Sequence, residues 1–80
     1  MPTVRIKICG VTSPADAIAA AELGADAVGL NFYPDSPRFV TPDTAKEIVA
    51  ALPPFVTAVG VFVDMPEDAV RSIASRVGLR

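Results

Sequence analysis

The sequence predicts an α/β fold in which short parallel strands alternate with helices. Three apolar segments, residues 4–9, 27–32 and 56–63, have the length and composition of β-strands. Each is followed by a segment that carries signals for the start and the end of a helix. Strands that alternate with helices through short loops pair in parallel and are joined by right-handed crossovers. We therefore expect three consecutive strand–helix units.

The first unit combines an alternating strand with an alanine-rich helix. Alternation places two sets of residues on opposite faces, Val4, Ile6 and Ile8 on one and Arg5, Lys7 and Cys9 on the other. Ser13 and Pro14 then provide an N-cap and a proline at the first helical position. Gly24 is a suitable end for this helix.

The second unit begins with a strand that is apolar almost throughout. Residues 27–32 have the composition of a strand that is buried on both faces. Thr41 and Pro42 repeat the pattern of a cap followed by proline, and Pro53 and Pro54 end the helix. The buried stripe of this helix has the spacing i, i+3, i+4 and i+7 and consists of Ala45, Ile48, Val49 and Leu52.

The third unit has an apolar strand over residues 56–63 and an amphipathic helix. Asp64 and Glu67, three residues apart, are typical of a capping pair at the start of a helix. The apolar stripe of the helix consists of Ala69, Val70, Ile73, Ala74 and Val77. Gly78 follows and predicts the end of the helix.

A short repeat links the second and third strands. Residues 27–30 (AVGL) match residues 58–61 (AVGV), and each copy contains a glycine, Gly29 or Gly60. Glycine within a buried strand indicates that something needs the space, and the crowded interior of a small barrel is one such place. Eight units of this length form a (β/α)8 barrel of roughly 200–250 residues. Residues 1–80 contain only three such units, so they would leave a barrel of this kind incomplete.

Composition excludes several classes of protein. Apolar residues make up 51% of the chain, which is too many for a disordered segment. The net charge is −2 and there is no basic run, so we expect no nucleic-acid partner. The chain has one cysteine and no histidine, so a zinc site of the Cys/His type and a serine–histidine triad are both unavailable. There is no glycine-rich phosphate loop, and we predict neither a metal nor a cofactor.

Targeting signals are also missing from the sequence. Residues 1–7 carry charges where a signal peptide has its apolar core. No run approaches the ~18 apolar residues that a membrane-spanning helix requires. We therefore expect a cytoplasmic protein without a membrane partner.

Cys9 is the first candidate for chemistry because it ends the first strand. The carboxyl ends of parallel strands are where α/β folds form their active sites. Lys7 shares the face of Cys9 at a distance of ~6.5–7 Å along the strand, close enough to favour a thiolate. A thiolate can act as a general base or as a nucleophile. A buried structural thiol, and a Lys7 paired with a carboxylate for structural reasons, are the alternatives.

Two further residues follow the other predicted strands. The loop over residues 33–39 is the longest connection, and its Arg38 can bind a carboxylate or a phosphate through two parallel hydrogen bonds. A solvated loop arginine is the alternative. Asp64 follows the third strand, where a helix cap is favoured over a catalytic acid.

Four motifs in order carry a resemblance to a known family. They are K-I-C-G-V-T at 7–12, G-A-D-A-V-G at 24–29, N-F-Y-P-D-S-P-R-F-V at 31–40 and P-P-F-V-T-A-V-G-V-F-V-D at 53–64. Together they resemble the N-terminal part of phosphoribosylanthranilate isomerases of the TrpF type. The resemblance covers nearly all 80 residues. It implies a (β/α)8 barrel without a cofactor that carries out an Amadori rearrangement in tryptophan biosynthesis.

The resemblance also implies roles for two residues of this chain. In the family, a cysteine after the first strand is the general base that removes the proton from C2′ of the sugar, and Cys9 matches it. An arginine in an S-x-R motif after the second strand contacts the anthranilate carboxylate, and Arg38 matches it. The family's general-acid aspartate and its phosphate-binding loops lie later in the barrel and have no counterpart among these residues. Asp64 does not stand at the position of the acid.

An incomplete barrel has physical consequences. Three parallel strands leave unpaired N–H and C=O groups on both edges of the sheet. The face that would line the barrel is expected to expose Lys7, Cys9, Gly29, Asn31, Gly60 and Phe62. We therefore expect the 80 residues alone to be inactive. They should either associate, with the remainder of the barrel or with further copies through the open edges, or be poorly stable. The remainder can belong to the same chain or to another.

Two other interpretations remain open at this point. One is a non-catalytic α/β interaction module derived from a barrel fragment, in which Cys9 would have no chemical role. The other is an unrelated flavodoxin-like open sheet, for which residues 10–13 would have to form a phosphate-binding loop.

Overall fold

The protein forms three β–α units, as the sequence predicts. The structure is a computed structural model that describes residues 4–79. The elements are β1 (Lys7–Cys9), α1 (Pro14–Glu22), β2 (Ala27–Asn31), α2 (Pro42–Ala51), β3 (Thr57–Val61) and α3 (Glu67–Val77). No helix in this part of the chain is both long enough and apolar enough to cross a membrane.

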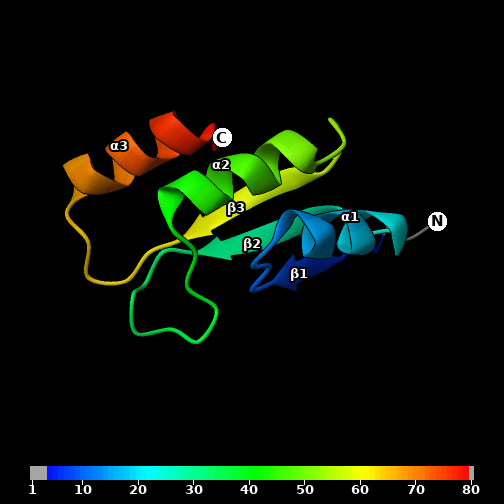
Figure 1. The fold of residues 1–80 in the computed structure, drawn as a ribbon, viewed down its shortest axis with the longest axis horizontal. Helices are drawn as coiled ribbons and strands as arrows, with labels where there is room; N and C mark the ends of the chain where they lie inside the picture. Colours follow the sequence, from blue (N-terminus) through cyan, green and yellow to red (C-terminus); the bar gives the residue numbers. More distant parts are fainter. Residues whose placement is uncertain (1–3, 80) are drawn as a thin grey trace.

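The three strands form one parallel sheet in the order β1-β2-β3. The register pairs Cys9 with Gly29 and Leu30 with Gly60. All three helices lie along one side of the sheet (Figure 1), as right-handed crossovers between neighbouring parallel strands require. We call the opposite side the inner face. It carries Lys7 and Cys9 of β1 and their register partners, and no element among residues 4–79 covers it.

The hydrophobic core lies between the sheet and the helices. Val28 and Leu30 of β2 have no exposed surface, and neither has Ile48 of α2. Each such side chain contributes roughly 1.5–3 kcal/mol of transfer free energy relative to an exposed one. The rings of Phe32 and Phe62 stack with centroids 5.1 Å apart and extend the core beyond the ends of β2 and β3. The core therefore holds the helices to one face and leaves the inner face free of packing.

The strands are shorter than predicted, most clearly at the start of β1. Paired residues begin at Lys7, and just before it the Ile6 carbonyl accepts from the N–H groups of Asp26 at 2.8 Å and Ala27 at 3.2 Å. The N–H of Ile6 donates to the Asp26 carboxylate at 2.7 Å rather than to a strand neighbour. This side-chain bond ends the ladder because it occupies the donor that a longer strand would use. The predicted ranges 27–32 and 56–63 shorten likewise to Ala27–Asn31 and Thr57–Val61.

Two of the three predicted helix starts are confirmed. The Ser13 hydroxyl caps α1 by accepting from the N–H of Asp16 at 3.1 Å, and Pro14 follows it. The Thr41 hydroxyl caps α2 in the same way, accepting from the N–H of Thr44 at 3.2 Å. Each cap satisfies a backbone donor that the first turn of a helix leaves without a partner.

The predicted capping pair at the start of α3 is wrong. Asp64 lies in a turn with φ 52°, two residues before the N-cap, which is Pro66. The ring of Pro66 fixes its φ near the observed −59°. Because Pro66 is the N-cap, the helix does not need the N–H that proline lacks, and it begins directly after this residue. The Glu67 carboxylate then pairs with Arg71 one turn later, at 2.5 Å, instead of capping.

The repeat in β2 and β3 does not place its two glycines on the same face. Ala27 pairs with Thr57, so the second copy is displaced by one residue, and a shift of one residue reverses the face of every side chain. Gly29 lies on the inner face beside Cys9, whereas a Cβ on Gly60 would lie 2.7 Å from Phe62 Cε2. The expectation that Gly60 and Phe62 line the inner face is therefore wrong. Both pack on the helix side.

Gly60 leaves the space that the Phe62 ring and the Leu79 side chain fill. A Cβ at this position would also lie 2.8 Å from Leu79 Cδ1. We expect Gly60→Ala to lower the free energy of unfolding of the full-length protein by about 1–3 kcal/mol, measured by urea unfolding, because overpacking forces core side chains to move. The loss should be smaller on a Leu79→Ala background, which removes one of the contacts. An unchanged midpoint in the single variant would contradict this.

Candidate functional site

The carboxyl ends of the three strands meet at one end of the sheet. All three arrowheads point to this end, and the loops that follow β1, β2 and β3 gather there (Figure 1). Cys9 is the last residue of β1 and Asn31 the last of β2. The loop between β2 and α2 contains Arg38, and the turn between β3 and α3 contains Asp64. Parallel strands therefore bring the predicted site residues to the same edge.

The Cys9 thiol lies on the inner face, directly beside Gly29. It is free and exposed. The Sγ atom is 3.2 Å from the point where a Cβ on Gly29 would stand, so the missing side chain makes room for the thiol. The Gly29 carbonyl accepts from the N–H groups of Gly10 at 3.1 Å and Val11 at 3.2 Å. These two bonds fasten the turn after Cys9 to β2 and so define where the thiol lies.

Lys7 shares the inner face with Cys9, as alternation predicts, and is exposed. Within residues 4–79 the ion pairs are Glu67–Arg71 and Asp43–Arg76, and neither includes Lys7. A structural ion pair of Lys7 is therefore not formed within the described part of the chain.

Arg38 lies against the turn that follows Cys9. Its Cγ atom is 3.0 Å from the position of a Cβ on Gly10, and its Cβ and Cδ atoms are 3.4 Å from it. Gly10 has φ 80°, a conformation that side-chain-bearing residues rarely adopt. Cys9 and Arg38 both border a hollow that runs along the open side of β1, and most of its lining comes from Ile8 and from Asp16, Ala19, Ala20 and Leu23 of the α1 region. The structure therefore brings the Arg38 stem beside the turn after Cys9, although the two residues stand 29 positions apart.

The loop that carries Arg38 is held by its own hydrogen bonds. The Ser36 hydroxyl accepts from the N–H of Arg38 at 3.1 Å, and the Tyr33 carbonyl accepts from the N–H of Ser36 at 3.0 Å. Asn31 takes part at both ends of the loop: its Oδ1 accepts from the N–H of Tyr33 at 2.8 Å and its carbonyl accepts from the N–H of Val40 at 2.9 Å. The sequence alone predicts no role for Asn31 in this loop. Its position two residues before Tyr33, at the end of a strand, is the signature of an Asx turn.

Asp64 does not join this group of residues. It is exposed and stands in the turn between β3 and α3. Its carboxylate takes part in none of the side-chain hydrogen bonds found within residues 4–79, so it caps no helix there.

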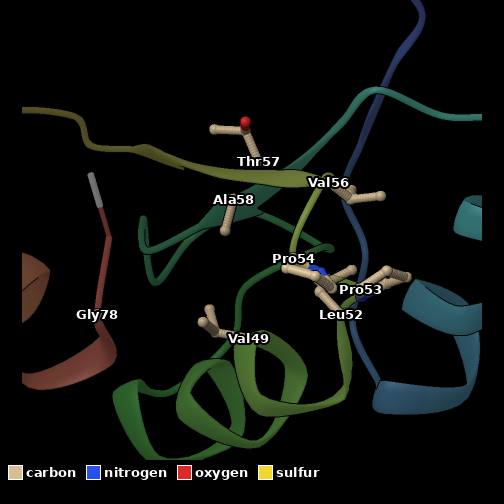
Figure 2. A pocket seen from close by; sticks show the side chains of 8 residues that line it. All are labelled: Val49, Leu52, Pro53, Pro54, Val56, Thr57, Ala58 and Gly78. Carbon is tan, nitrogen blue, oxygen red and sulfur yellow. The ribbon is translucent and has the colours of Figure 1, made fainter.

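A separate pocket lies at the amino end of β3 and differs from the site in its lining. Its residues, drawn in Figure 2, are Val49, Leu52, Pro53, Pro54, Val56, Thr57, Ala58 and Gly78. The Ala58 side chain points toward α2, and the Thr57 hydroxyl points to the other side of the strand (Figure 2). With its one polar side chain turned away, this pocket of about 160 Å³ offers no acid, base or nucleophile. This pocket is a gap in the packing around α2, at the end of the sheet opposite to the one where Cys9 and Arg38 lie.

Gly10 couples the backbone after Cys9 to the position of Arg38. We expect Gly10→Ala to raise KM of the full-length protein severalfold, because the new methyl group displaces the Arg38 stem. The left-handed backbone should add roughly 1–2 kcal/mol of destabilisation. Gly24→Ala is the matched control, because Gly24 has φ 94° and nothing within 4 Å of an added Cβ. An equal rise in KM in both variants would contradict the contact with Arg38.

The fold and this end of the sheet define a class of protein: a parallel α/β protein built from strand–helix units, with a thiol and an arginine side chain at the carboxyl ends of its strands. The sequence model of the family described as N-(5'phosphoribosyl)anthranilate (PRA) isomerase matches residues 6–80. The chain therefore belongs to the PRA isomerase family.

Individual relatives agree with the family. The chain is 58% identical over 79 residues to N-(5'-phosphoribosyl)anthranilate isomerase of Azotobacter vinelandii, covering 99% of this chain and 38% of the relative. It is 53% identical over 75 residues to the isomerase of Prosthecochloris aestuarii, covering 94% and 34%. The chain thus spans somewhat more than a third of the length of these relatives.

Solved structures match the fold over the same share. The phosphoribosyl anthranilate isomerase of Thermotoga maritima superposes with a TM-score of 0.93 at 49% identity, covering 96% of this chain and 38% of that one. The enzyme of Thermus thermophilus gives 0.91 at 43% identity, covering 96% and 38%. The three units are therefore those of a TIM barrel, and the flavodoxin-like alternative is excluded.

Proposed function

We propose that residues 1–80 are the N-terminal portion of a single (β/α)8 barrel domain of an N-(5′-phosphoribosyl)anthranilate isomerase. The reaction is the Amadori rearrangement of tryptophan biosynthesis, an intramolecular oxidation and reduction of the aldose–ketose type. One observation carries the proposal: in a chain of this family, Cys9 ends β1 and the Arg38 stem packs against Gly10, the next residue along the chain.

Cys9 acts as the general base. Its thiolate removes the proton from C2′ of the sugar, and loss of this proton lets the carbonyl character move from C1′ to C2′. The exposed thiol on the inner face, next to a glycine, supports this role because a substrate atom can approach it from inside the barrel. A positioned base contributes roughly 10²–10⁴ to a proton-transfer rate.

Arg38 binds the carboxylate of the anthranilate group. The planar guanidinium matches a carboxylate through two parallel hydrogen bonds. A solved relative, with a TM-score of 0.93, was crystallised in complex with reduced 1-(o-carboxyphenylamino)-1-deoxyribulose 5-phosphate, a small molecule that carries such a carboxylate. We propose the corresponding phosphoribosylated anthranilate as the substrate of this protein.

The partners and the location follow from the same proposal. The remainder of the barrel, in this chain or another, covers the inner face and supplies the general acid and the phosphate site. Where the remainder of the barrel is absent, the open sheet edges can pair further copies of the protein. Separately, a relative from Thermotoga maritima is described as dimeric, so association of complete barrels is also part of the proposal. A cytoplasmic location is part of the proposal, because the proposed substrate is a phosphorylated intermediate of biosynthesis. The residues described here supply a base and a cation, and the proposal needs no cofactor.

The test is turnover by purified full-length protein given N-(5′-phosphoribosyl)anthranilate, followed by formation of the 1-deoxyribulose product. An analogue without the ring carboxylate, N-(5′-phosphoribosyl)aniline, serves as a control and should show a raised KM. Absence of turnover by the folded full-length protein would overturn the proposed function.

A further inference from the structure

The loop between β2 and α2 is closed at both ends by a single residue. Asn31 accepts from the N–H of Tyr33 through its side chain at 2.8 Å and from the N–H of Val40 through its carbonyl at 2.9 Å. Asn31 also forms a parallel bridge with Phe39. The residues between these contacts contain Arg38, so the start and the end of its loop are fixed to one point on β2.

The Arg38 side chain has few contacts of its own. It is exposed, its stem lies against Gly10, and its backbone N–H donates to the Ser36 hydroxyl. A ligand that binds Arg38 must order its long side chain, which costs rotamer entropy. If the loop backbone also had to be ordered on binding, the free-energy cost of binding would be larger. The direction of Arg38 therefore depends on how firmly the loop backbone is held.

The Asn31 side chain lies on the inner face, and its hydrogen bond is local. Alternation from Gly29 puts Asn31 on the same face, one position further toward the carboxyl edge. Removing the side chain frees the N–H of Tyr33 but leaves the backbone bond to Val40 intact. A truncation should thus loosen the first part of the loop without unfolding the sheet.

We infer that Asn31 is a positioning residue for Arg38: its side chain holds the first turn of the loop and so sets the direction from which the guanidinium meets the substrate carboxylate. The inference rests on the proposed function, since it assigns Arg38 a ligand. Asn31 makes no contribution to the proton transfer at Cys9.

The test uses two variants of the full-length protein, Asn31→Ala and Asn31→Ser. Loss of one hydrogen bond that orients a binding group predicts an increase in KM of roughly five- to tenfold in Asn31→Ala, with kcat changed less than about twofold. Serine keeps a short side-chain acceptor and can form the equivalent turn, so Asn31→Ser should return KM to within about threefold of the wild type.

Two further measurements separate this role from others. On an Arg38→Ala background, Asn31→Ala should leave KM unchanged, because the group that it positions is gone. Amide hydrogen exchange of Tyr33 should rise in Asn31→Ala and return in Asn31→Ser, whatever the activity of the protein.

Each result has a distinct meaning. A full KM effect on the Arg38→Ala background would overturn the inference in favour of direct contact between Asn31 and substrate. Faster exchange at Tyr33 with unchanged KM would also overturn it, leaving the proposed function standing. A wild-type protein without turnover would overturn the proposed function and the inference together, and the exchange data would then describe only the loop.

Discussion

Replacing Cys9 by serine in the full-length protein should lower kcat by roughly 10²–10⁴ with a much smaller change in KM. The serine hydroxyl is similar in size but is not ionised near neutral pH, so the base is lost while the shape of the site is kept. The measurement is steady-state kinetics with N-(5′-phosphoribosyl)anthranilate. Cys9→Ala should give a comparable loss, because it removes the same proton acceptor.

The Cys9 variants also distinguish the two classes of function that the sequence leaves open. An interaction module without chemistry would tolerate either substitution, whereas an isomerase would not. Cys9→Ser exchanges one small side chain for another of similar size, so this variant should change the urea midpoint by no more than a few tenths of a molar. A variant with normal stability and unchanged kcat would remove Cys9 from the mechanism.

Replacing Arg38 by alanine should have the second largest effect on the reaction. Hydrogen bonds to charged groups contribute about 1.5–3 kcal/mol, so loss of the guanidinium predicts an increase in KM of roughly 10- to 100-fold. The carboxylate is remote from C2′, so kcat should fall far less than in the Cys9 variants. The measurement is a comparison of KM and kcat between the Arg38→Ala variant and the wild type.

Arg38→Lys is the control for charge. Lysine keeps a positive charge but cannot form two parallel hydrogen bonds, so it should recover only part of the lost affinity. The carboxylate-free analogue should bind Arg38→Ala and the wild type about equally. A large difference with the analogue would mean that Arg38 acts on another part of the substrate.

Local sequence signals were sufficient to predict the order and type of every element. The helix starts at Ser13 and Thr41 are decided by hydrogen bonds between neighbours three residues apart, which a sequence displays directly. The start of α3 was mispredicted because Asp64 and Glu67 match a capping pair in spacing, while the rigid ring of Pro66 determines where the helix begins. When two local signals compete in this way, the backbone geometry is needed to decide where the helix begins.

Contacts across the sheet were harder to predict. The repeat in β2 and β3 suggested equivalent glycines, but strand register is a property of pairing, and the displacement by one residue sends Gly60 to the helix side. For the site, Cys9 ends one predicted strand and Arg38 follows the next, so the sequence was sufficient to predict that both lie at the carboxyl end of the sheet. The contact of Arg38 with Gly10 and the double role of Asn31 depend on how the loop folds back, which residue types alone do not determine.

The bonds from Gly10 and Val11 to the Gly29 carbonyl, and the contact between Gly10 and Arg38, all join residues that lie within 9–40. The contacts that fix the Arg38 stem beside the turn after Cys9 therefore lie within the first half of these 80 residues, and a substitution in that half can disturb both residues at once.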